Sequence, residues 1–97
     1  MIIQEVLAQL ENAVNPIGKI LQRGDQFKVI VMGFKKGMVL KEHQTPIPAK
    51  LVVIDGSVLY RQGEGSVTLN RFDEQKIPVA VIHSVEALEN SICILIQ

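Results

Sequence analysis

The sequence predicts an all-β fold, a sandwich or barrel, with one short helix at its N-terminus. Val and Ile together account for 24 of the 97 residues, and β-branched side chains favour strands over helices. Turn residues recur at intervals of roughly 8 to 12 residues, which is typical of an all-β sandwich or barrel and too short for alternating strands and helices.

The composition limits both the size and the partners of the protein. A chain of 97 residues fits one domain spanning 1–97, and a hydrophobic content of 47% excludes disorder. The formal net charge is zero, which gives no general attraction for nucleic acid or for anionic lipid surfaces. Seven of the ten basic residues lie between Lys19 and Lys50, but the whole chain has only four aromatic residues, few for a nucleic-acid surface.

The sequence also indicates where the protein works. The longest apolar run, Ile92 to Ile96, is too short to cross a membrane, and residues 1–5 lack the pattern of an export signal. We therefore expect a cytoplasmic protein without a membrane partner. The single cysteine, Cys93, cannot form an internal disulfide, and we expect it to pack as a small hydrophobic residue.

The first element is the exception to the strand-like pattern. Ile3, Leu7, Leu10 and Val14 follow one another at offsets of four, three and four, which is the spacing of one helix face. Asn15-Pro16 then ends the helix. We expect a helical segment within residues 1–15 and a β-barrel over residues 18–97.

The strands that follow lie between turn signals at 24–25, 33–37, 44–48, 55–56, 63–65 and 70–75. Three of them, at 29–32, 51–54 and 92–96, are apolar at every position. Because side chains alternate between the two faces of a strand, such runs need cover on both sides. The N-terminal helix covers some of this surface, and a second copy of the chain is expected to cover the rest. The sequence therefore predicts a homodimer.

The only two histidines carry the clearest pattern in the chain. His43 follows Gly37 after five residues, and Gly56 lies thirteen residues further on, while His83 follows Pro78 after four residues. This arrangement resembles the two sequence motifs of the small single-domain cupins, and the likeness spans about 27–96. The resemblance implies an RmlC-like jelly-roll barrel that binds its ligands inside the mouth.

The chain departs from those motifs at several positions. Thr45 and Ala49 stand where the first motif has its second histidine and its glutamate. In the second motif Phe72, Ala80 and Ala87 replace two glycines and an asparagine. Two of the four metal ligands that the resemblance implies are thus absent.

The resemblance also implies which residues line the pocket. Alternation along each strand then places the following candidates on interior faces: His43, Thr45, Ala49, Leu51, Val81 and His83. His43 and His83 are the candidate ligands of a divalent metal, which would be iron, nickel, manganese or zinc. Two imidazoles should bind such an ion weakly, because catalytic sites generally use three protein ligands. Glu86 is a candidate substitute ligand, and Tyr60 and Arg61 are expected at the surface or at a dimer contact.

Three functions fit these observations. The first is a module without a complete metal site, homodimeric, that binds a small organic ligand or serves in an assembly. The second is a metal-dependent cupin enzyme of the dioxygenase or isomerase type that uses His43 and His83. The third, the sensor domain of a transcription regulator, lacks a DNA-binding segment, because the single predicted helix is not basic. The two histidines could also be ordinary interior residues, hydrogen-bonded to the backbone.

Overall fold

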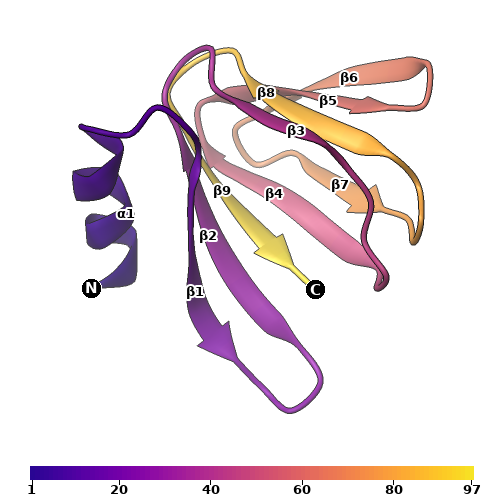
Figure 1. Ribbon diagram of the computed structural model, residues 1–97, viewed down its shortest axis with the longest axis horizontal. Coiled ribbons are helices and arrows are strands. Elements are labelled where there is room, and N and C mark those ends of the chain that lie inside the picture. Colours follow the sequence, from indigo (N-terminus) through magenta and orange to yellow (C-terminus); the bar gives the residue numbers. More distant parts are fainter.

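Two antiparallel β-sheets face each other and one helix lies outside them, in a computed structural model that describes residues 1–97 (Figure 1). The elements in chain order are α1 (Ile2–Leu10), β1 (Ile17–Arg23), β2 (Lys28–Phe34), β3 (Val39–His43), β4 (Ala49–Asp55), β5 (Ser57–Gln62), β6 (Gly65–Asn70), β7 (Glu74–Ile77), β8 (His83–Ala87) and β9 (Ser91–Ile96). No helix is long and apolar enough to span a membrane.

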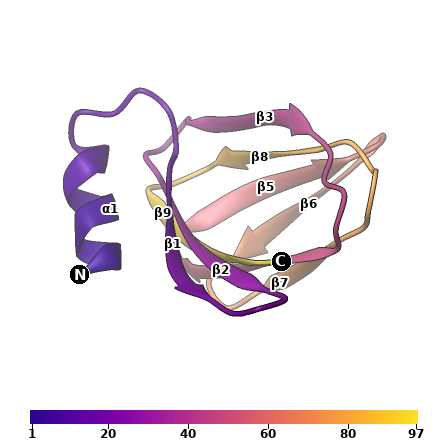
Figure 2. The same ribbon diagram turned by 60° about the horizontal axis from the view of Figure 1, so that its bottom comes forward.

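The two sheets form a jelly roll. One sheet has the strand order β1-β2-β9-β4-β7 and the other β3-β8-β5-β6, and Figure 2 shows the second sheet lying over the first. From β2 onward the chain crosses from one sheet to the other at nearly every turn; only β5 and β6 follow each other within one sheet. The prediction of an all-β barrel with a short N-terminal helix is confirmed.

The core fills the space between the sheets. Strand alternation supplies it: in β4, for example, Ala49, Leu51 and Val53 are buried while the residues between them are partly exposed. Cys93 of β9 is fully buried in the same cluster, and burial raises the pKa of its thiol to about 12. It therefore packs as a small hydrophobic residue, as expected.

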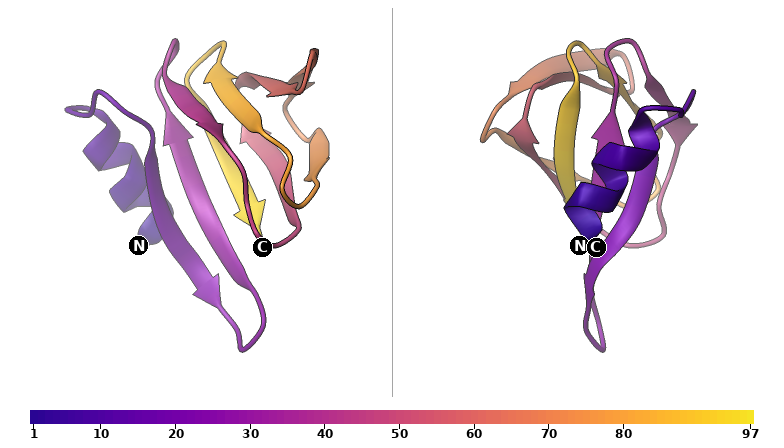
Figure 3. Two further views of the ribbon diagram at one scale, coloured as in Figure 1. Left: turned by 45° about the vertical axis from the view of Figure 1, so that its right-hand side comes forward. Right: turned by 90° about the vertical axis from the view of Figure 1, so that its left-hand side faces the viewer.

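The helix packs on the outer face of β1 and β2 (Figure 3). Val6 and Leu10 are buried against Val31, and Gly33 allows this close approach, since a Cβ there would lie 2.6 Å from Val6 Cγ1. A helix of nine residues gains most of its stability from such packing.

Two expectations about the helix were wrong. It ends at Leu10 and not near Asn15, because the chain turns at Glu11 and Asn12. Its buried face is Ile2, Val6 and Leu10, whereas Leu7 and Val14 are largely exposed. Both sets of residues have the spacing of one helix face, so the spacing alone does not show which face is buried. The face with Val6 and Leu10 is the buried one because Gly33, which has no side chain, leaves room for these two residues against the sheet.

The helix covers only part of the outer face of the five-stranded sheet. Cross-strand rows place Val29 beside Ile96, and Ile94 beside Val52, on this face. Ile96 is 40% exposed and Ile54, near the end of β4, is 39% exposed. We call these five residues the outer apolar face. Strands that are apolar on both sides thus keep one side partly open to solvent.

Candidate functional site

The two histidines meet at one end of the four-stranded sheet. His43 ends β3, His83 begins β8, and the two residues are cross-strand partners. Their ring centroids are 4.2 Å apart with an interplanar angle of 60°. His83 is only 3% exposed, and on its other side the Tyr60 ring stacks at 5.9 Å. Residues forty positions apart in the sequence thus form one aromatic cluster.

Each imidazole is fixed by the backbone two residues before it. His43 Nδ1 donates to Lys41 O at 2.7 Å, and His83 Nδ1 donates to Val81 O at 3.0 Å. A carbonyl oxygen only accepts, so Nδ1 carries the proton and Nε2 of a neutral ring keeps its lone pair. Both rings can therefore offer an Nε2 acceptor.

Burial sets the protonation of this cluster. Desolvation lowers the pKa of His83 below its ordinary value, and the nearby His43 lowers it further, while the hydrogen bond to Val81 opposes both effects. Desolvation also raises the pKa of Tyr60, whose hydroxyl donates to Gln62 Oε1 at 2.8 Å. The neutral forms of His83 and Tyr60 are thus the stable forms at neutral pH.

A small cavity lies against the histidines inside the barrel. Its volume is about 20 Å³, and it is lined by His43, Thr45, Ala49, Leu51 and His83 among others. A space of this size holds about one water molecule. The interior of the barrel is therefore nearly filled by its own side chains.

The structure brings together five of the six residues that the sequence placed in the pocket. Val81 does not line the cavity. Because β8 begins only at His83, the alternation does not extend back to Val81, which contributes its carbonyl oxygen instead. Thr45 Oγ1 lies at the cavity but donates to Ile47 O at 2.8 Å.

Two further expectations were wrong. Tyr60 is not a surface residue but is 2% exposed in the core, because it shares the inner face of β5 with Val58. Glu86 is not a neighbour of the histidines: it lies on the opposite face of β8 from His83 and pairs with Arg61, Nη2 to Oε1 at 3.0 Å. The charged residue Arg61 marks the outer face of β5, and this is the signal that could have placed Tyr60 on the inner face, since neighbouring residues of a strand point to opposite sides.

The donor set does not fit a resident metal ion. No group of three or more His, Cys, Asp or Glu side chains is arranged to hold one. Two imidazoles are available, Ala49 offers no donor, and the Thr45 hydroxyl is a neutral and poor ligand. No chemical step through a metal follows from these residues.

A larger hollow opens at the end of the barrel next to the histidine cavity. We call it the mouth hollow; its volume is about 730 Å³, within the range of ligand sites. It shares Ala49 and Ile77 with the histidine cavity. Gln62 and Gln75 supply amide groups, and its charged lining residues are two lysines, Lys50 and Lys76.

The backbone at the four glycine positions of the two sequence motifs supports the resemblance. Gly37 and Gly56 have φ values of 88° and 86°. The only non-glycine residues with positive φ are Phe72, at 75°, and Ala80, at 59°, and these replace the two glycines of the second motif. The left-handed conformation is thus kept where the glycine is lost, although it costs an L-residue free energy.

Comparisons with known proteins agree on the fold. No protein-family model matches the chain, and no curated protein matches it. Similar solved structures include a cupin superfamily protein of Desulfitobacterium hafniense, with 17% identity over 95% of this chain and 86% of the other and a TM-score of 0.80. An RmlC-like cupin of Desulfovibrio desulfuricans has 20% identity over 88% of both chains and a TM-score of 0.77.

One further similar structure is KdgF of a Halomonas species, with 21% identity over 88% of this chain and 79% of that chain and a TM-score of 0.79. At these identities the likeness concerns the fold. The chain is a small domain with the cupin fold, as the motif resemblance implied.

Proposed function

We propose that this cupin-fold protein binds a small organic ligand at the barrel mouth, without a resident metal. The observation that carries the proposal is the fixed imidazole pair beside a ligand-sized hollow, since binding sites combine apolar walls with a few well-placed polar groups. The filled barrel interior supports placing the ligand in the mouth hollow, with its inner end toward His43 and His83. The mouth hollow meets the histidine cavity only at Ala49 and Ile77, so the imidazole Nε2 atoms would accept hydrogen bonds from a ligand group that reaches past these two side chains.

Native mass spectrometry of freshly purified, untagged protein tests this function. We expect a low-mass species bound to the chain, and its loss in a His43→Ala/His83→Ala variant. Gln44→Ala is the matched control, because Gln44 is exposed beside His43. Absence of a bound species from the wild-type chain, or its full retention by the double variant, would contradict the proposal.

A second candidate is a metal-dependent enzyme of the dioxygenase or isomerase type. The specific observation in its favour is that both Nδ1 atoms are anchored by backbone carbonyls, as the outer nitrogen of metal-bound histidines generally is. Metal analysis after purification without tag or chelator distinguishes the two functions. Stoichiometric iron, nickel, manganese or zinc that disappears in the same double variant would replace the first proposal by this one.

We also propose that the protein is a homodimer that pairs through the outer apolar face. Its support is the partly exposed row of Val29, Val52, Ile54, Ile94 and Ile96, of which only Ile94 packs against the cluster beneath α1, together with a net charge of zero, so that two copies do not repel each other. A stable interface needs about 800 Å² from each partner, which requires the strands around these residues as well.

Light scattering at micromolar concentration tests the dimer. We expect twice the chain mass of 10.7 kDa for the wild type and one chain mass for Ile96→Asp. Val67→Asp, at a similarly exposed position on β6, should remain dimeric. A wild-type mass of one chain would refute the dimer.

Finally, we propose a cytoplasmic location without nucleic-acid or membrane partners. The support is the balance of ten basic and ten acidic residues, and a single buried thiol that needs no oxidising compartment. Cell fractionation with an antibody against the chain tests the location, and recovery in the membrane or secreted fraction would contradict it.

A further inference from the structure

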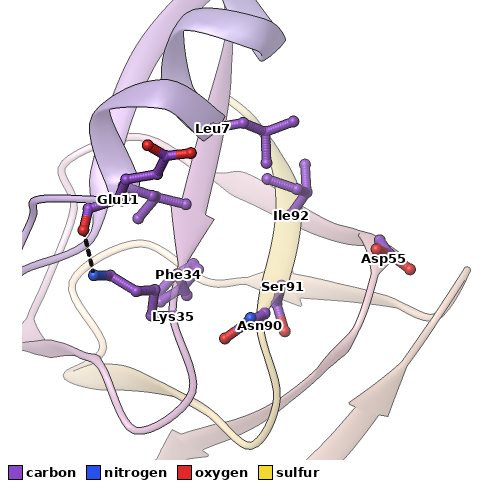
Figure 4. A pocket seen from close by; sticks show the side chains of 9 residues that line it. Leu7, Glu11, Phe34, Lys35, Asp55, Asn90, Ser91 and Ile92 are labelled. Atoms are coloured by element: carbon purple, nitrogen blue, oxygen red, sulfur yellow. Dashed lines mark hydrogen bonds between the residues drawn. The ribbon is translucent and has the colours of Figure 1, made fainter.

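A second hollow lies outside the barrel, between the C-terminal half of α1 and the ends of β2, β4 and β9 (Figure 4). Its volume is about 230 Å³, and we call it the helix-side hollow. It shares no lining residue with the mouth hollow, so binding here would be independent of the function proposed above.

The wall of the helix-side hollow is apolar. Leu10 and Phe34 form its buried part, and Leu7 and Ile92 lie side by side along one edge (Figure 4). Leu7 is 48% exposed, which leaves its methyl groups facing the open space. This wall can take up the hydrocarbon part of a small ligand.

The rim of the hollow is polar and largely held in place. Lys35 Nζ donates to Glu11 O at 3.1 Å, drawn in Figure 4, and Asn90 Oδ1 accepts from Lys36 N at 2.8 Å. The carboxylates of Glu11 and Asp55 take part in neither of the two ion pairs of the chain. Two carboxylates therefore outnumber one ammonium group that already binds a carbonyl oxygen.

A β-bulge puts Asp55 on this rim. The pairing of β4 with β9 shifts between Val53 and Asp55, so that Val53 lies opposite Cys93 and Asp55 lies opposite Ile92. Cys93 faces the core and Ile92 faces the helix. Without the extra residue, Asp55 would share the face of Val53 and point into the barrel, since residues two apart lie on the same side of a strand.

From this geometry we propose that the helix-side hollow binds a small protonated aliphatic amine. The ammonium group lies toward the Asp55 carboxylate, and the hydrocarbon lies against Leu7 and Ile92. The hollow, with a volume of about 230 Å³, accommodates a short alkyl chain, and the ligand proposed is of the size of hexylamine.

Titration of the 15N-labelled full chain with hexylammonium, followed by amide chemical shifts, tests the assignment. We expect saturable shifts at residues of the helix-side hollow, with millimolar affinity for so small a ligand. Hexanoate and hexanol, which have the same hydrocarbon and a negative or no charge, should bind at least about tenfold more weakly. Asp55→Asn should weaken hexylammonium binding roughly three- to tenfold.

Matched variants distinguish the contribution of the ammonium charge to the affinity from that of the hydrocarbon. Asp25→Asn removes an exposed carboxylate in the turn between β1 and β2 and should leave the affinity unchanged, whereas Leu7→Gln should weaken hexylammonium binding and leave methylammonium unaffected. Equal affinity for hexanol, shifts located elsewhere, or an unchanged Asp55→Asn variant would each overturn the proposal. Tighter binding of a lysine blocked at both ends would show that the occupant is a protein side chain and not a free amine.

Discussion

Two glycines with the same backbone conformation make a sharp test of the fold. Gly37 and Gly56 have φ values of 88° and 86°, so alanine meets the same conformational penalty at both, about 1 to 2 kcal/mol. The lower entropy of the unfolded chain returns about 0.4 to 1 kcal/mol. At Gly37 the added Cβ meets no atom within 4 Å, and we expect Gly37→Ala to lose about 1 kcal/mol.

At Gly56 the same methyl group has no room. It would overlap Ser91 Oγ and the Asn90 carbonyl oxygen, and it would lie 2.8 Å from Ser91 Cα. Ser91 Oγ accepts from Ser57 N at 3.0 Å, and this hydrogen bond joins the start of β5 to the start of β9 in the other sheet. Overpacking of this kind costs about 1 to 3 kcal/mol, so Gly56→Ala should lose about 3 kcal/mol in total.

Urea unfolding followed by far-ultraviolet circular dichroism measures the difference. With a slope of about 1 to 1.5 kcal/mol per molar urea for a small domain, an extra loss of about 2 kcal/mol lowers the midpoint of Gly56→Ala by about 1.3 to 2 M relative to Gly37→Ala. Equal midpoints for the two variants would refute the packing around Gly56 and leave only the shared backbone conformation.

Four further predictions follow from the structure. Val6→Ala should lower the free energy of unfolding by about 2 kcal/mol, because Val6 is 0% exposed, whereas Leu7→Ala should lower it by less than about 1 kcal/mol. A larger loss for Leu7→Ala than for Val6→Ala would show that the helix buries the face that contains Leu7. Ala80→Gly, at a φ of 59°, should raise thermal stability by up to about 1 kcal/mol through relief of strain, and a loss would contradict the left-handed conformation. Burial lowers the pKa of His83 in the folded chain, so that on acidification the unfolded chain binds this proton at a higher pH than the folded chain does. The free energy of unfolding should therefore be constant above about pH 6.5 and fall as the pH drops below that value. His83→Gln should reduce this dependence of the unfolding free energy on pH, as measured by urea titrations. The Cys93 thiol, with a pKa of about 12, should react with a disulfide reagent at least about 100-fold more slowly in the native chain than in urea, and equal rates would show that it is accessible.

Most of the fold was predictable because it depends on local patterns. Turn residues separate the strands at nearly the positions expected, and alternation within 49–53 gives the inner face of β4. The buried face of the helix was not predictable, since Ile2, Val6 and Leu10 have the same helical spacing as the predicted set that contains Leu7. The choice rests on contact with Gly33, which is distant in sequence.

The candidate site was predictable in its members and not in its size. The spacing of His43 and His83 from the turn residues places them in one cluster, and the structure puts their rings 4.2 Å apart. The interior volume is the difference between the space enclosed by two sheets and the summed volume of their side chains, which no local pattern contains. The position of Tyr60 was missed for a different reason: it was grouped with Arg61 after the turn at Gly56, although the two side chains lie on opposite faces of β5.

The position of β3 at the rim of its sheet has a kinetic consequence. It hydrogen-bonds to β8 alone, and the ladder is interrupted between Leu40 and His43. A strand paired along one side opens locally more often than its neighbours. Such opening would uncover His83, which is buried, whereas His43 is already partly exposed. The rate of local opening would then limit how fast a solvent molecule reaches the buried imidazole.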